Sequence, residues 1–238
     1  MEPSVMKAIE RHLEEFSIST TKRENLVTFK AKKYYLILYD VAKKNNCGTL
    51  LRSASAFGCS GIIVGNVKKK SELSTFGAHG ADNHLNFYFH QDPFFYARKV
   101  LGCELLIGIE IRDDSISVSS SEFRSLVRNI SSCAFVLGNE GTGMSRFAAS
   151  KCDKFLYIPQ YGGGTASLNV AVAGSIIFQK FSELAAYQEW EREKEKFVVE
   201  ELSIEQKILL NTHIAVEKRA LRSSQIVEEI FASDLLDI

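Results

Sequence analysis

Residues 134–145 have the sequence AFVLGNEGTGMS, an apolar run that passes directly into a turn with three glycines, an amide and a carboxylate. The run Ala134–Leu137 is short and ends at a glycine, which is typical of a strand buried on both faces of a parallel sheet. The turn is neither a P-loop, since no Gly-Lys-Ser/Thr follows, nor a G-x-G-x-x-G fingerprint. Such a turn is a common way to leave a strand, and Asn139 beside Glu140 adds the prediction of a polar site.

Further apolar runs on both sides of this stretch predict the strands Tyr34–Tyr39, Gly61–Val64, Leu85–Phe89, Leu105–Ile109 and Phe155–Ile158. Helical spacing between them predicts helices over Leu50–Phe57, Phe94–Leu101 and Phe123–Ile130. Ser119 and Glu122 form a capping box for the last of these. A longer helix is predicted from Ser167 to about Trp190, capped by Ser167 or Thr165. The alternation predicts an α/β fold, with a mostly parallel sheet that carries helices on both faces.

The sequence divides into three predicted segments. Residues 1–32 hold an amphipathic helix and a basic segment, residues 33–182 the α/β domain, and residues 183–238 an acidic helical extension. The extension carries 13 acidic and 7 basic residues, which leaves 22 basic and 16 acidic residues in the rest of the chain. Two explanations fit this charge asymmetry equally well. One is a solvated acidic tail on an ordinary body, and the other is a body that faces a polyanion.

Composition narrows the class of protein. Of 238 residues, 45% are hydrophobic and 24% are charged, which is ordinary for a soluble globular protein. No apolar run approaches the roughly 18 to 20 residues of a membrane-spanning helix, and Glu10, Glu14 and Glu15 interrupt any signal peptide. Five cysteines without a C-x-x-C pair indicate reduced thiols and no metal site. We therefore predict an intracellular, most simply cytoplasmic protein that binds neither membrane nor metal; a nuclear or organellar location stays open.

A second polar junction follows the first predicted strand at residues 46–52, Asn-Cys-Gly-Thr-Leu-Leu-Arg. Asn46 is placed to cap the helix that follows, and Gly48 lets another backbone approach closely. A helical arginine such as Arg52 is usually exposed to solvent. Its apolar neighbours leave it little surface, however, and this favours a phosphate or carboxylate partner for the guanidinium fork.

The third junction covers residues 158–173, Ile-Pro-Gln-Tyr-Gly-Gly-Gly-Thr-Ala-Ser-Leu-Asn-Val-Ala-Val-Ala. Its glycine run would expose backbone N–H and C=O groups to a ligand, although it holds no lysine for a phosphate. Asn169 lies in an otherwise apolar first helical turn, either as an incidental amide or as a functional one. All three junctions follow apolar strands, and ligand-binding loops lie at the carboxyl edge of a parallel sheet.

Together the three junctions resemble the motifs of the SpoU (TrmH-like) branch of the knotted SPOUT methyltransferases. The shared features are Asn-x-Gly leading to Arg and a Phe-Gly end, a strand ending in Gly-Asn-Glu-Gly-x-Gly, and an Ile-Pro loop ending in Ser-Leu-Asn-Val. Residues 74–78, Ser-Thr-Phe-Gly-Ala, are similar to the family's small-residue segment between the first two motifs. The resemblance covers residues 33–182. The third loop is one residue longer than the common family form, and Ala166 stands where a polar residue is frequent.

The resemblance implies a C-terminal trefoil knot, a homodimer that completes the active site, and S-adenosylmethionine as methyl donor. The implied reaction is methylation of a ribose 2′-hydroxyl of RNA, with tRNA favoured over rRNA because short helical ends replace a large RNA-binding domain. The implied catalytic residues are Arg52, Asn46, Glu140, Ser167 and Asn169. The implied cofactor-binding residues are Leu137, Gly138, Ile158, Gln160, Ser167 and Leu168. A dimer interface or a core position fits the apolar residues Val170, Val172, Ile176 and Ile177 equally well.

RNA contacts are expected from a set of basic residues, and binding should therefore be sensitive to salt. They are Lys22, Arg23, Lys30, Lys32, Lys33 and Arg52, together with Lys68–Lys70. The resemblance makes Arg52 the activator of the hydroxyl. Because arginine holds its proton in proteins, we expect Arg52 to bind the neighbouring phosphate and orient the hydroxyl rather than to act as a free base.

Three alternatives compete with this interpretation. A catalytically inactive RNA-binding dimer of the same fold should have lost Arg52, Asn169 or the glycines, and all are present. A nucleotide-binding α/β enzyme would need a lysine-containing phosphate loop or a G-x-G-x-x-G turn, and the sequence has neither. A base methyltransferase of another SPOUT branch is disfavoured by the Ser-Leu-Asn ending, which is an argument by analogy.

Overall fold

The computed structural model describes residues 32–199 except residues 40, 42, 66–72 and 74. Seven strands form one sheet in the order β3-β2-β1-β6-β4-β7-β5, and every neighbouring pair is parallel. The strands are β1 (Lys33–Leu38), β2 (Gly61–Val64), β3 (Phe87–Phe89), β4 (Leu105–Ile109), β5 (Ile116–Ser117), β6 (Ser132–Leu137) and β7 (Lys154–Tyr157). The predicted α/β architecture with a mostly parallel sheet is confirmed.

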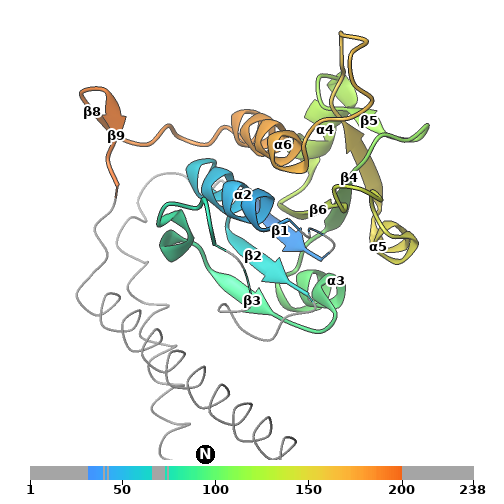
Figure 1. The fold of residues 1–238 in the computed structure, drawn as a ribbon, viewed down its shortest axis with the longest axis horizontal. Helices are drawn as coiled ribbons and strands as arrows, with labels where there is room; N and C mark the ends of the chain where they lie inside the picture. The colour runs from blue at the N-terminus through green and yellow to red at the C-terminus, as the bar shows by residue number, and fades with distance from the viewer. Residues whose placement is uncertain (1–31, 40, 42, 66–72, 74, 200–238) are drawn as a thin grey trace, which may run out of the picture. The chain divides into compact units, whose positions relative to one another are not determined.

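Helices cover both faces of this sheet (Figure 1). They are α2 (Lys44–Ala56), α3 (Pro93–Phe95), α4 (Ser121–Asn129), α5 (Arg146–Lys151) and α6 (Val170–Leu184), with the short turns η3 (Ala81–His84) and η4 (Tyr96–Val100). Tyr34 and Leu36 of β1 share a core with α2, α4 and α6, whereas Tyr35 and Ile37 share the opposite core with α3 and α5. Successive side chains of β1 thus alternate between two cores, and this explains why the whole strand is apolar.

Helices α2 and α6 pack against each other over the sheet (Figure 1). Gly174 of α6 permits their close approach, since a β-carbon there would lie 2.5 Å from Cδ2 of Leu50 on α2. The hydroxyl oxygens of Ser175 and Ser53 lie 2.6 Å apart across the same contact. Both helices follow parallel strands, so this packing brings their first turns together at the carboxyl edge of the sheet.

Two helix starts differ from prediction. Helix α4 is capped by Ser120, whose Oγ accepts a hydrogen bond from the Phe123 N–H at 3.1 Å. The capping box predicted at Ser119 and Glu122 is therefore wrong by one residue. Helix α2 begins well before the predicted start, so Asn46 lies inside its first turn and does not cap it. The apolar spacing begins only at the second turn of α2, because its first turn is polar.

The long apolar helix is shorter than predicted at both ends. Helix α6 begins at Val170, and the side chain of Asn169 caps it, so neither Ser167 nor Thr165 is the cap. The helix ends at Leu184 instead of near residue 190. The chain then enters a small antiparallel hairpin of β8 (Arg192–Glu193) and β9 (Lys196–Phe197).

The sequence patterns missed η3, α5, β5 and the hairpin. These elements have two to six residues and lack the continuous apolar run that predicted the short buried strands. The amphipathic helix predicted in the N-terminal segment and the helices of the acidic extension after residue 199 lie outside the described residues, and the trefoil knot stays a prediction. Within the residues that the structure does describe, no helix is both long enough and apolar enough to cross a membrane.

Gly48 joins helix α2 to the loop that precedes η3. A β-carbon at this position would overlap the carbonyl oxygen of Phe76 and would lie 2.5 Å from its carbonyl carbon and 3.0 Å from the backbone nitrogen of Ala78. The obstacle is backbone, which cannot rotate away as a flexible side chain could. A glycine is therefore needed here for the close approach of two backbones.

We expect Gly48→Ala to lower the free energy of unfolding by about 2 to 4 kcal/mol, because the loop over α2 must shift to admit a methyl group. Urea denaturation followed by circular dichroism would measure it. Gly162→Ala is the matched control, since no atom lies within 4 Å of its added β-carbon and its φ is not positive. An unchanged midpoint for Gly48→Ala would contradict the close backbone contact.

Candidate functional site

The three glycine- and asparagine-containing junctions meet at the carboxyl edge of the sheet. They follow β1, β6 and β7, and in the strand order β6 is next to β1 while only β4 separates it from β7. The carboxyl ends of parallel strands lie at the same edge, where α2 and α6 also begin. The first turns of both helices therefore flank the loop that follows β6.

A chain of hydrogen bonds joins the three junctions through their side chains. Oε1 of Glu140 accepts from Nδ2 of Asn46 at 2.8 Å and from the backbone N–H of Lys43 at 2.9 Å. Oδ1 of Asn46 accepts from Nδ2 of Asn169 at 3.1 Å. Oδ1 of Asn169 in turn accepts from the N–H groups of Ala171 at 2.8 Å and residue 172 at 3.3 Å, and thereby caps α6. Three of the five predicted catalytic side chains are thus in direct contact.

The direction of this chain is fixed at both of its ends. An ionised carboxylate can only accept, so Asn46 must present its NH₂ group to Glu140 and its oxygen to Asn169. The backbone N–H groups at the start of α6 can only donate, so Asn169 must present its oxygen to them and its NH₂ group to Asn46. An aspartate at either asparagine position could not donate, which explains why both side chains are amides.

Cys47 lies beside this network without reactive character. Burial raises the pKa of its thiol to about 11, and the negative charge of Glu140 adds to the rise. The thiol is therefore protonated at neutral pH and packs as an apolar side chain. In the described part of the chain, no three His, Cys, Asp or Glu side chains gather as a metal site would require.

The loop after β6 is folded back on itself. The backbones of Asn139 and Gly143 exchange two hydrogen bonds, and Oδ1 of Asn139 accepts from the N–H groups of Gly141 and Thr142 at 2.9 and 3.2 Å. A β-carbon at Gly138 would lie 2.5 Å from the backbone nitrogen of Met144, which closes the loop. This loop is consequently a closed unit that aims Glu140 at α2.

Glu110 supports the loop after β6, and the sequence patterns did not predict this role. It follows β4 directly, and its Oε2 accepts a hydrogen bond from the Met144 N–H at 2.9 Å. Its backbone N–H donates to the carbonyl of Leu156 on β7 at 3.0 Å, so the residue joins β4, β7 and the loop after β6. The available signal was its place: a glutamate directly after the apolar run Leu105–Ile109.

Arg52 and Ser167 lie outside the network. Arg52 is exposed on α2, and among the described residues it has no ion-pair or hydrogen-bond partner. The prediction that its apolar neighbours leave it little surface is wrong, because Leu51 and Ala54 point into the core while Arg52 points outward. Ser167 is exposed, and its backbone N–H bonds to Oγ1 of Thr165 at 3.4 Å.

The predicted cofactor residues combine an apolar wall with free backbone groups. Leu137 is buried at the end of β6, whereas Ile158, Gln160 and Leu168 are half-buried on the loop between β7 and α6. Among the described residues, no backbone group from 159 to 164 makes a hydrogen bond to another residue. A ligand placed against this wall would therefore find unpaired N–H and C=O groups around its polar atoms.

The predicted RNA-binding lysines lie elsewhere, where they fall within the described residues. Lys32 and Lys33 stand at the start of β1, at the opposite edge of the sheet from the site. The ammonium group of Lys32 donates to the carbonyls of Arg128 and Ile130 at 2.8 and 2.7 Å, at the end of α4. Two of its three donors are used inside the fold. Lys22, Arg23, Lys30 and Lys68–Lys70 lie outside the described residues, and all these RNA contacts stay predictions.

Sequence comparison finds a family and curated relatives. The model of the SpoU rRNA Methylase family matches residues 33–179. One relative is a Staphylococcus aureus (strain COL) protein that is provisionally named a TrmH family tRNA/rRNA methyltransferase. It is 30% identical over 172 residues, which cover 69% of this chain and 62% of that protein. The 23S rRNA (guanosine(2553)-2′-O)-methyltransferase RlmP of Bacillus subtilis (strain 168) is 29% identical over 150 residues, or 60% and 55% of the two chains. The chain thus spans less than two thirds of the length of these relatives.

Solved structures share the fold at low sequence identity. The AdoMet-bound rRNA methyltransferase from Sinorhizobium meliloti has a TM-score of 0.53 at 23% identity, over 63% of this chain and 56% of that one. The SpoU methyltransferase AviRb from Streptomyces viridochromogenes, in complex with AdoMet, has a TM-score of 0.52 at 21% identity, over 70% and 62%. Likeness at this level of identity concerns the fold.

We expect Asn46→Ala to lower the free energy of unfolding by about 2 kcal/mol, because it leaves both Glu140 and Asn169 short of a partner. In a double-mutant cycle with Asn169→Ala, the coupling energy should be about 1 kcal/mol. Asn169→Ala also removes the cap of α6. This loss occurs both with and without Asn46→Ala, so it cancels from the coupling energy. Urea denaturation of the four proteins gives the result.

Ser120→Ala is the matched control, since Ser120 also caps a helix but belongs to α4 and does not contact Asn46. Its effect should add to that of Asn46→Ala within about 0.5 kcal/mol. Strict additivity of Asn46→Ala and Asn169→Ala would mean that their hydrogen bond contributes nothing.

Proposed function

Because the chain belongs to the SpoU rRNA Methylase family, we propose that it transfers a methyl group from S-adenosylmethionine to a ribose 2′-hydroxyl of RNA, with tRNA favoured over rRNA. The observation that carries this proposal is the convergence of Asn46, Glu140 and Asn169 on one hydrogen-bond chain, with Arg52 exposed on α2, the helix that carries Asn46. The names of the two curated relatives, one for tRNA/rRNA and one for a 2′-O position in 23S rRNA, support the same class of reaction.

The residues present suit S-adenosylmethionine. Leu137, Ile158 and Leu168 would form the apolar wall for its adenine ring, and the unpaired backbone groups of residues 159–164 would meet its polar edges. Gln160 and Ser167 would add side-chain contacts from the same loop. When bound, this cofactor supplies an electrophilic methyl group on a sulfonium sulfur. Because that chemistry is already activated, alignment of the hydroxyl is what remains for the protein to provide.

We assign that alignment to Arg52. Its guanidinium group has no competing partner among the described residues, and it can grip a phosphate through two parallel hydrogen bonds. A phosphate held in this way fixes the adjoining ribose, and the positive charge stabilises the developing alkoxide. The network ties the first turn of α2 to the loop after β6 and to the start of α6, so Asn46, Glu140 and Asn169 would act by positioning α2 with its Arg52 and the loop between β7 and α6.

A homodimer is part of the proposal. Val172 and Ile176 lie one turn apart on α6 and remain 47% and 38% exposed, which gives this helix an apolar outer face. Ile177, by contrast, is fully buried and belongs to the core, and Val170 is half-buried against it. An interface on α6 would therefore use Val172 and Ile176, and it would cover the helix whose first turn belongs to the site.

Calorimetric titration should detect saturable binding of both S-adenosylmethionine and S-adenosylhomocysteine to the purified protein. In Asn169→Ala we expect the affinity to fall by about tenfold, because the start of α6 and the adjoining loop lose their shared hydrogen bond. The absence of binding to a folded wild-type protein would instead favour the inactive RNA-binding dimer of the same fold.

Transfer of a labelled methyl group into bulk tRNA and rRNA then identifies the RNA. A 2′-O-methyl group blocks alkaline cleavage at its nucleotide, so the label should survive as an alkali-stable dinucleotide. Label recovered in mononucleotides would indicate base methylation and would contradict the proposed ribose position.

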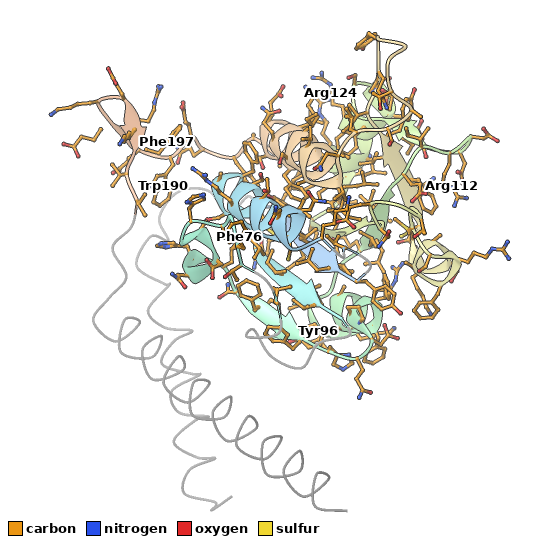
Figure 2. The ribbon with its side chains drawn as sticks, viewed as in Figure 1. Phe76, Tyr96, Arg112, Arg124, Trp190 and Phe197 are labelled. Atoms are coloured by element: carbon orange, nitrogen blue, oxygen red, sulfur yellow. The ribbon has the colours of Figure 1, made fainter. Side chains whose placement is uncertain are left out.

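We expect Arg52→Lys to lower kcat by about 10- to 100-fold, because an ammonium group cannot reproduce the two-pronged grip on phosphate. The dissociation constant for S-adenosylmethionine should not change. Arg124→Lys is the matched control, since Arg124 is an exposed arginine on α4 (Figure 2). Near-normal turnover by Arg52→Lys would refute the geometric role.

A further inference from the structure

Phe76 is an aromatic side chain that faces solvent beside α2. Its side chain is 72% exposed, and it contacts no other aromatic ring of the described residues. Figure 2 labels it next to α2. A lone exposed aromatic ring is common on protein surfaces, so exposure by itself carries no inference. What sets Phe76 apart is how its backbone is held and what lies beside it.

The backbone under this ring is held in place. The carbonyl group of Phe76 packs against Gly48 of α2 so closely that no β-carbon would fit between them. Gly77 follows with a positive φ of 93° and lies against Thr49, and the buried Ala78 donates its N–H to the carbonyl of Thr75 at 2.9 Å. The ring is therefore an exposed group on a fixed base, and a contact made by it costs little ordering of the chain.

Arg52 lies on the same face of α2, one turn beyond Gly48. Residues four apart on a helix are neighbours, and one turn corresponds to about 6 Å along the axis. Helical side chains lean toward the N-terminus and cover the preceding turn. Arg52 therefore leans toward the turn that holds Gly48, and the backbone of Phe76 is seated on that same turn.

We propose that Phe76 stacks on a nucleobase of the RNA substrate, next to the ribose whose phosphate Arg52 holds. This inference rests on the proposed function and adds to it a second contact to the same nucleotide or its neighbour. The chemistry is that of a single-stranded segment, in which an unpaired base lies on an aromatic face while a guanidinium group grips the backbone. Because every base has a π-face, such a platform accepts many sequences and selects for an unstacked nucleotide.

The first test separates RNA binding from cofactor binding. We expect Phe76→Ala to raise KM for unmodified bulk tRNA by about tenfold, while the dissociation constant for S-adenosylmethionine measured by calorimetry stays that of the wild type. Phe76→Tyr keeps a stacking face and should retain the wild-type KM. Phe95→Ala is the matched control, since Phe95 is 52% exposed on α3, which packs on the opposite face of the sheet.

The second test detects the stacking itself. The chain has one tryptophan, so Trp190→Phe gives a background in which Phe76→Trp is the sole indole fluorophore. Addition of a single-stranded RNA oligonucleotide of random sequence should quench this fluorescence, and the same RNA as a duplex should quench it far less. Binding of the oligonucleotide is measured separately, by the fluorescence anisotropy of a label on the RNA.

The outcomes keep the two proposals apart. An unchanged KM in Phe76→Ala, or RNA binding without quenching at position 76, would overturn the stacking platform and leave the methyl-transfer proposal standing. Quenching by single-stranded RNA in a protein that binds no S-adenosylmethionine would do the reverse: it would support the platform and overturn the proposed reaction.

Discussion

The carboxylate of Glu140 can only accept hydrogen bonds, and this constraint orients every side chain that joins the three loops of the site. The orientation passes through Asn46 and Asn169 and ends on the backbone N–H groups at the start of α6. Negative charge at one end of the chain is thus connected to the positive end of a helix dipole at the other. Loops whose linked residues lie 94 and 123 residues apart in the sequence become one polar unit with a single arrangement.

Helix packing makes that unit rigid from below. Gly174 lets α6 approach α2 closely, and Gly48 lets the loop before η3 approach α2 from another side. Both contacts place backbone or apolar atoms where a side chain would otherwise be, so two neighbouring segments hold α2 closely at residues 48 and 50. The loop between β7 and α6 is held less firmly, since residues 159–164 form no hydrogen bonds with other described residues. A fixed polar floor beneath a loop with unpaired backbone groups suits a ligand that is bound through that loop.

The sequence was sufficient for the parts of the fold that depend on apolar pattern. β1 and β6 were predictable because strands buried on both faces are apolar throughout, and the three motifs were expected to meet because each follows such a strand. Contacts that depend on three dimensions were not predictable. Asn46 looked like a cap because it precedes the apolar spacing, yet α2 begins before it. Glu110 was missed because its partner, Met144, lies 34 residues away. The exposure of Arg52 depends on which face of α2 packs on the sheet, and an apolar neighbourhood in the sequence does not reveal that.

The proposed RNA contacts fall into two groups, the lysines at the amino edge of the sheet and the residues on and beside α2. Lys32 and Lys33 stand at the amino edge, and β1 alone separates them from the site by about 20 Å. Contacts at that distance reach phosphates several nucleotides away, and phosphate contacts position an RNA without identifying a base. In the proposed complex, selection of the nucleotide would then come from Arg52 on α2 and from Phe76, whose backbone packs on the same helix. In the proposed complex, charge far from the reaction would govern how RNA binding responds to salt, whereas the geometry of α2 would govern which ribose is presented. The first property could be expected from lysine content, but the second required the structure, since it depends on the single helical turn between Gly48 and Arg52.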